Sequence, residues 1–109
     1  MTREWTLEGA RSVLADVRSR TQRAVEETEK LVLAREGAPP EEQNRIDARI
    51  QQQIERWARE MDALGAEVKG LWLVDFDSGS GYYCWRWPEE SLEYFHGYEE
   101  GFAGRSRIQ

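Results

Sequence analysis

The hydrophobic period of this chain changes once along its length, and that change limits the folds it can adopt. Through residue 64, small and apolar residues recur every three or four positions, as they do along one face of an α-helix. From Trp72 onward, large apolar residues alternate with polar ones, a period of two that is typical of β-strands. Ten aromatic residues fall between Trp72 and Phe102. The sequence therefore predicts an α+β fold in which a helical part precedes a small aromatic sheet.

The helical part divides into two helices at the segment Gly37-Ala38-Pro39-Pro40. Thr6 is a suitable N-cap, and we expect the first helix over residues 6–35. The prolines end this pattern because they lack backbone donors, and the second of them can open another helix over residues 40–64, with Gly65 following its last turn. So short a connection makes the helices antiparallel. The predicted stripes are Ala10, Leu14, Val17, Thr21, Ala24, Thr28 and Leu31, and Ile46, Ile50, Ile54, Trp57, Met61 and Leu64.

The aromatic part contains a hairpin signal, Ser78-Gly79-Ser80-Gly81, between two alternating runs. A loop centred on Gly79-Ser80 pairs Asp77 with Tyr82. On the opposite face from the apolar residues, this register sets Asp75 across from Cys84 and Leu73 across from Arg86. It gathers six large apolar residues on one face, which are Trp72, Val74, Phe76, Tyr83, Trp85 and Trp87.

A third strand is expected over Leu92–His96, after a turn at Pro88-Glu89-Glu90-Ser91. Two registers remain open for it. Pairing Cys84 with His96 would complete a row of Asp75, Cys84 and His96 across three strands, whereas a one-residue slip would place His96 among the aromatic residues.

These elements make up the predicted architecture, a long antiparallel helical hairpin followed by a three-stranded antiparallel β-meander packed against it. The sheet occupies residues 67–96, a turn-rich tail follows over residues 97–109, and residues 1–109 form a single domain.

The net charge of −6 lies mainly in the aromatic part of the chain. Residues 1–65 carry eleven Lys/Arg and thirteen Asp/Glu (−2), and residues 66–109 carry four and eight (−4). Nucleic-acid binding needs a basic surface, so we expect no nucleic-acid partner. No apolar run reaches the roughly 20 residues of a membrane span, which predicts no membrane association. A lone cysteine and an N-terminus without an apolar core predict a cytoplasmic protein.

Several short motifs, in order, resemble one bacterial family that is catalogued only as a domain of unknown function, number 2203. The motifs are Trp5-Thr6-Leu7-Glu8, Leu73-Val74-Asp75-Phe76, Cys84-Trp85-Arg86, Glu89, His96 and Gly101-Phe102-Ala103-Gly104-Arg105. The chain departs from the family pattern at Trp72 and Pro88, where glycine is usual, and at Asp77, where proline is frequent. The resemblance covers nearly the whole chain and implies no activity. The motif positions that we take as candidate ligand-binding residues are Asp75, Cys84, Arg86, Glu89, His96 and Arg105.

Three of these candidates, Asp75, Cys84 and His96, belong to residue types that can ligate zinc. No CxxC, HxxxH or HExxH spacing accompanies them, and we therefore expect no metal and no cofactor. In the structural interpretation, Cys84 is a small buried hydrophobe, His96 is hydrogen-bonded near the sheet edge, and Asp75 pairs with Arg86 or Arg105. A catalytic pair of Cys84 and His96, oriented by Asp75, would need an electropositive and accessible cysteine. The acidic surroundings do not favour that setting, and we expect no enzyme.

The remaining candidates, Arg86, Glu89 and Arg105, allow two interpretations. Guanidinium groups offer a bidentate fork to a small anion or carboxylate. The same residues can instead form structural salt bridges that attach the tail to the sheet, which is the interpretation we favour.

The predicted function is a non-enzymatic protein-interaction or small regulatory module that self-associates as a homodimer, or binds another protein, through the helical hairpin. The expected contacts are Val25, Leu31, Val32, Leu33 and Ile46. The alternative is a small-ligand or metal-binding protein that uses the polar face of the sheet, with Asp75, Cys84, Arg86 and His96. A concave pocket on that face would favour the alternative, and a flat or covered face would favour the interaction module.

Overall fold

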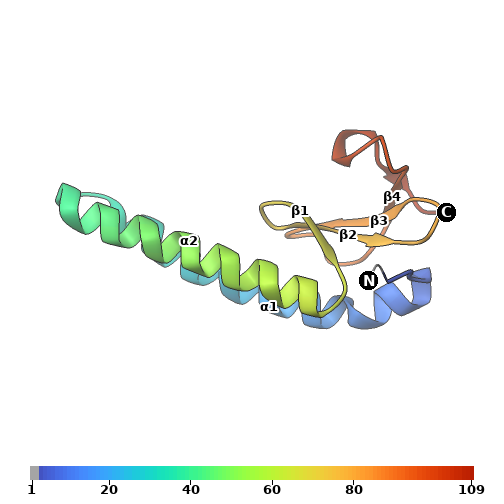
Figure 1. Cartoon of the computed structure of the whole chain (residues 1–109), viewed down its shortest axis with the longest axis horizontal. Helices are drawn as coiled ribbons and strands as arrows, with labels where there is room; N and C mark the ends of the chain where they lie inside the picture. Colours follow the sequence, from blue (N-terminus) through green and yellow to red (C-terminus); the bar gives the residue numbers. More distant parts are fainter. Residues whose placement is uncertain (1–2) are drawn as a thin grey trace.

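A computed structural model, which describes residues 3–109, places a long helical hairpin beside a five-stranded antiparallel sheet (Figure 1). The predicted α+β class is confirmed, but the expectation of three strands is wrong. The elements are α1 (Leu7–Arg35), α2 (Pro40–Ala63), β1 (Glu67–Gly70), β2 (Leu73–Asp77), β3 (Tyr82–Arg86), β4 (Tyr94–His96), a 3-10 turn η1 (Phe102–Gly104) and β5 (Ser106–Arg107).

The helix ends follow from local chemistry that the sequence displays. The Thr6 hydroxyl accepts the Gly9 backbone N–H at 3.0 Å, which caps α1. Pro40 occupies the first turn of α2, where a backbone donor would have no partner. After α2, Gly65 adopts a φ of 89°, and its N–H bonds to the carbonyl of Asp62 at 2.9 Å. This left-handed residue ends the helix and turns the chain toward the sheet.

The two helices meet along the predicted stripes in the half of the hairpin nearest the sheet. Ala10, Leu14, Val17 and Ala24 of α1 are buried with Trp57 and Met61 of α2. One polar contact lies inside this seam: the indole N–H of Trp57 donates to the hydroxyl of Thr21 at 2.8 Å. The Thr21 hydroxyl in turn donates to the carbonyl of Val17 at 2.7 Å, so the buried indole has a partner that is itself fixed.

The apolar face of the sheet closes the core against the helices, as the alternation predicts. Val74, Phe76 and Trp85 are completely buried, and Trp72, Tyr83 and Trp87 pack around them. The rings of Trp57 and Trp72 meet edge to face with centroids 5.0 Å apart. Large aromatic side chains thus supply much of the buried apolar surface of a small core.

The register of the first hairpin is confirmed, since Asp77 pairs with Tyr82 and Asp75 with Cys84. Neither register considered for the third strand is correct. β4 pairs His96 with Tyr82, two residues away from the predicted partner. Because side chains alternate, a two-residue offset keeps His96 on the polar face. A Cβ at Gly81 would lie 2.3 Å from the ring of Phe95, so this glycine leaves the space that the ring needs in this register.

Two further short strands extend the sheet at its edges. β1 pairs Glu67 with Asp75, and β5 pairs Ser106 with Phe95, so the tail is not turns alone. With four and two residues, these strands are too short for a recognisable alternation. β1 nonetheless matters for the site, because it adds a row of side chains to the polar face.

The hairpin projects well beyond the sheet (Figure 1), in a molecule whose extents are 50 × 25 × 25 Å. In this distal half, Val25 and Ile46 are mostly buried within the chain, which leaves little of either side chain for a partner to contact. Val32 and Leu33 are exposed, at 46% and 67%. Within residues 3–109, neither helix combines the length and the apolar character needed to cross a membrane.

Candidate functional site

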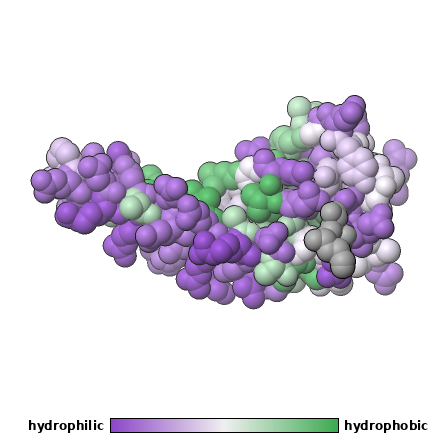
Figure 2. Space-filling model, in the orientation of Figure 1, coloured by the Kyte–Doolittle hydropathy of each residue, from purple (hydrophilic) through white to green (hydrophobic). Residues whose placement is uncertain are grey.

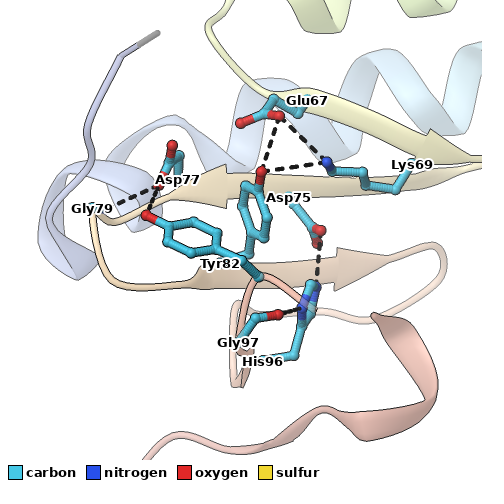
Figure 3. A network of polar contacts seen from close by, with 9 residues as sticks. Glu67, Lys69, Asp75, Asp77, Gly79, Tyr82, His96 and Gly97 are labelled. Atoms are coloured by element: carbon cyan, nitrogen blue, oxygen red, sulfur yellow. Dashed lines mark hydrogen bonds and ion pairs between the residues drawn. The ribbon is translucent and has the colours of Figure 1, made fainter. Parts of the chain in front are cut away.

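The polar face of the sheet carries a cavity. Figure 3 shows that side chains from four strands, β1 to β4, meet on this face. Asp75 and Cys84 lie opposite each other on β2 and β3, and His96 reaches the same place from β4. These residues line a cavity of about 300 Å³, together with Lys69, Leu73, Tyr82, Tyr98, Gly101 and Phe102. The concave form is the arrangement that favours a ligand-binding role for this face.

Asp75, Cys84 and His96 form a compact buried cluster, which we call the Asp-Cys-His cluster. One carboxylate oxygen, the thiol sulfur and one imidazole nitrogen all lie within 4.8 Å of one another. The exposed fractions of the three residues are 2%, 0% and 3%. The three residues therefore converge, a possibility that the sequence left open, through a register that was not among the two considered.

The hydrogen bonds of His96 show where its protons lie. Its Nδ1 is 2.8 Å from the carbonyl oxygen of Gly97, and since a carbonyl only accepts, Nδ1 carries a proton. Its Nε2 is 2.8 Å from Oδ2 of Asp75, as Figure 3 shows, and one further proton must lie between these two atoms. The pair is thus either an imidazolium with a carboxylate or a neutral imidazole with a carboxylic acid. Asp75 pairs with His96, so its predicted pairing with Arg86 or Arg105 is wrong.

The second carboxylate oxygen of Asp75 has no hydrogen-bond partner among residues 3–109, although it is buried. Burial raises the pKa of Asp75, and the neighbouring His96 opposes that rise. A buried oxygen without a donor costs free energy, and such atoms are few in folded proteins. This oxygen lies in a cluster of potential metal ligands, where a cation would satisfy it.

Cys84 does not have the properties of a nucleophile. Burial, and next the charge of Asp75, raise the pKa of its thiol from 9.0 to about 12. The thiolate that a nucleophilic mechanism needs is therefore scarce near neutral pH. Both ring nitrogens of His96 are already engaged, so no nitrogen remains to act as its base.

Lys69 and Tyr82 form the rim of the cavity on the β1 side. The Lys69 ammonium donates to the Tyr82 hydroxyl at 3.4 Å, lies 3.4 Å from the Glu67 carboxylate, and sits 4.5 Å from the centre of the Tyr82 ring (Figure 3). The ring of Tyr82 packs against that of His96 with centroids 5.5 Å apart. Sequence reasoning missed these lining residues. The alternation on β3 places Tyr82 on the same face as Cys84, whereas the four residues of β1 are too few for their alternation to signal Lys69.

Three candidates do not line the cavity and lie beside it: Arg86, Glu89 and Arg105. The guanidinium of Arg105 makes a two-pronged ion pair with Glu89, and lies over the rings of Tyr94 and Phe102 at 4.0 and 4.2 Å. Glu89 also accepts the backbone N–H of Arg86 at 2.8 Å. The Arg86 guanidinium lies 5.1 Å from the Phe102 ring. The Glu89 carboxylate thus occupies both donors of the Arg105 guanidinium, and this ion pair connects the C-terminal tail to the turn before β4.

Two hydrogen bonds, made by Glu100 and Tyr98, hold the segment that follows β4 against the polar face. Glu100 accepts the backbone N–H of Gly97 at 2.7 Å, and the Tyr98 hydroxyl donates to Asp77 at 2.8 Å. The carbonyl that orients His96 belongs to this same segment. The fold therefore fixes the imidazole from both of its nitrogens.

Comparison with known proteins gives a family for the chain and no function. No curated protein and no solved structure matches it. Residues 3–108 match the sequence model described as "Uncharacterized conserved protein (DUF2203)", and the chain therefore belongs to this family.

Proposed function

We propose that the polar face of the sheet binds a metal ion, and that this ion is Zn²⁺. The observation that carries the proposal is the Asp-Cys-His cluster, whose three donor atoms lie within 4.8 Å of one another in a buried setting. Donor atoms of a tetrahedral zinc site lie about 3.5 Å apart, given bonds of about 2.0–2.3 Å. Side-chain adjustments of about 1 Å would bring the cluster to that spacing.

The chemistry of the cluster suits zinc in three respects. Thiolate, imidazole and carboxylate are its usual protein ligands. The Nδ1–H of His96 donates to a backbone carbonyl, which is the arrangement that leaves Nε2 directed at a metal. An ionised Asp75 and an ionised Cys84 would balance the two positive charges of the ion, which would otherwise be costly to bury. The unpartnered oxygen of Asp75 would also gain a partner.

The test uses Co²⁺, which reports a thiolate ligand through a sulfur-to-cobalt charge-transfer band. Full-length protein stripped with chelator and titrated with Co²⁺ should bind one ion per chain and develop this band. Cys84→Ser, which keeps the size of the side chain, should lose the band. Substitution of a residue that only hydrogen-bonds to a metal ligand lowers metal affinity roughly 10–100-fold. Asp75→Asn removes a ligand itself and should lower Co²⁺ affinity by more than that.

The matched control is Asp47→Asn, since Asp47 pairs with Arg35 on the distal hairpin, far from the cluster along the chain. This variant should bind Co²⁺ like the parent protein. Circular dichroism of each variant establishes that it is folded. Folded parent protein that takes up no stoichiometric Co²⁺, or Zn²⁺ by calorimetry, would show that the cluster is only a buried hydrogen-bonded pair beside a thiol.

We also propose that the chain, as a single domain over residues 1–109, self-associates as a homodimer through the helical hairpin. Val32 and Leu33 are exposed on α1, and a mainly apolar groove of about 320 Å³ lies beside them, lined by Val25, Thr28 and Trp72. Figure 2 shows hydrophobic surface gathered in the corner between hairpin and sheet. Exposed apolar patches of this kind mark interaction sites.

Light scattering at rising concentration tests the homodimer. The parent protein should approach twice its chain mass, whereas Val32→Glu/Leu33→Glu should remain at one chain. Gln52→Glu, an exposed position on α2, is the control and should behave like the parent. A parent protein that stays at one chain mass at high micromolar concentration argues against the homodimer, leaving another protein as the partner of the hairpin. A cytoplasmic location and a bacterial origin remain predictions from the sequence.

A further inference from the structure

The cavity above the Asp-Cys-His cluster is lined by both polar and apolar side chains. At about 300 Å³ it has room for about ten water molecules, at roughly 30 Å³ each. The polar groups are those of the cluster and the Lys69 ammonium, which we call together the polar end. Leu73 and Phe102, with the rings of Tyr82 and Tyr98, supply the apolar lining. Such a division is typical of sites for small organic ligands, in which a few polar groups fix the orientation of an apolar body.

The polar end offers two positive centres, provided that the metal proposed above is bound. Three protein donors leave one position of a four-coordinate ion for a ligand. Lys69 is the one Lys or Arg among the described residues that line this cavity. Asp75 is the one carboxylate in that lining, and it would be taken by the metal. Glu67 pairs with Lys69 from outside the lining set.

We infer that this cavity binds a small monocarboxylate with an apolar body, one carboxylate oxygen on the metal and the other facing Lys69. The inference rests on the proposed zinc site. A carboxylate suits both centres, because its two oxygens can serve a Lewis acid and an ammonium donor at once. The apolar body lies against Leu73 and Phe102. A neutral molecule of the same shape lacks the charge for either centre, so charge and shape together define the ligand class.

Benzoate is the probe, and benzamide is its neutral counterpart of the same shape. Co²⁺-loaded full-length protein should change its visible absorption on titration with benzoate and saturate at one equivalent. Benzamide should produce no saturable change. Acetate, which lacks the ring, should bind more weakly than benzoate. Equal responses to benzoate and benzamide, or to benzoate and acetate, would overturn the inference.

Variants separate the roles of the lining residues. Lys69→Gln should weaken benzoate binding about tenfold, the effect of one lost charge-assisted contact, while Co²⁺ affinity stays within about twofold. Glu67→Gln is the matched control, because it removes the partner of Lys69 but keeps the cation, and benzoate affinity should not fall. Phe102→Ala should weaken benzoate more than acetate.

The order of measurements distinguishes failure of this inference from failure of the zinc proposal. Co²⁺ uptake and its charge-transfer band are recorded before any carboxylate is added. If the ion does not bind, the zinc proposal is wrong, and the carboxylate inference, which needs the ion, is wrong with it. If the ion binds with the band and benzoate leaves the spectrum unchanged, the zinc site stands and the carboxylate inference is wrong.

Discussion

At the residue scale, two threonines of α1 that look alike in sequence have opposite roles. The Thr21 hydroxyl accepts the indole N–H of Trp57, whereas the Thr28 hydroxyl is buried with no partner among residues 3–109. Thr21→Val should therefore cost about 1–3 kcal/mol in the free energy of unfolding, because the buried indole N–H loses its acceptor. Thr28→Val removes an unsatisfied group and should be neutral or stabilising. Urea denaturation of both variants checks this, and equal losses would contradict it.

Cys84 gives a second prediction at this scale, for the metal-free protein. Its thiol has a pKa of about 12 in the folded chain against 9.0 ordinarily, mainly through burial. Below about pH 9 the Cys84 thiol keeps its proton in both the folded and the unfolded chain, so its ionisation takes nothing from the free energy of unfolding. As the pH rises further, only the unfolded chain releases it, so stability should fall by up to about 1.4 kcal/mol per pH unit until about pH 12.

Cys84→Ala isolates this contribution, since other groups titrate alike in both proteins. Urea denaturation at several pH values between about 8 and about 11 should show a steeper loss of stability for the parent than for the variant. Parallel stability curves would mean that the thiol titrates alike in the folded and unfolded chains.

At the element scale, Gly65 joins the end of α2 to the N-terminal segment. Its φ of 89° disfavours any side chain, and an added Cβ would lie 3.0 Å from the ring of Trp5. Gly37 also has a positive φ, of 75°, but nothing lies within 4 Å of an added Cβ. Gly37→Ala should cost about 1–2 kcal/mol for the backbone alone, and Gly65→Ala should cost more. Thermal or urea unfolding of both measures the difference, and a smaller loss at Gly65 would refute the role of the Trp5 contact.

How well each element could be predicted depended on whether its cause is local. Thr6, Pro40 and Gly65 act on their own neighbourhoods, and the helix ends lie within one residue of the predicted bounds. The hairpin at Gly79-Ser80 likewise set its own register. The register of β4 was predicted wrongly because it depends on how Phe95 fits against Gly81, and these residues belong to separate parts of the chain. β1 and β5 escaped notice because four and two residues hold too little periodicity.

The candidate site was predictable in part for the same reason. Strict alternation on β2 and β3 placed Asp75 opposite Cys84, so that half of the cluster followed from local pattern. His96 joined it only through the register of β4. Lys69 entered through a strand that was not predicted, and the pairing of Asp75 with His96 depended on three-dimensional proximity that no sequence spacing expresses.

At the scale of the whole molecule, packing is unevenly distributed along the hairpin. The half of the hairpin nearest the sheet shares the core with it, while the distal half buries only Val25 and Ile46 to a comparable degree. Two helices with one apolar stripe each have little to stabilise them beyond the sheet. The fold thus combines a rigid support for the polar face with a projecting hairpin of lower expected stability.

Amide hydrogen exchange should resolve this difference. In dilute protein, amides between residues 26 and 45 should exchange faster than those between residues 7 and 24, because local opening there exposes less apolar surface. If the hairpin self-associates, raising the protein concentration should slow exchange around Leu33, and Val32→Glu/Leu33→Glu should abolish that dependence. Uniform protection along α1 in dilute monomeric protein would contradict the uneven packing. Protection that is independent of concentration would instead count against the homodimer alone, because local stability and association are separate causes of slow exchange.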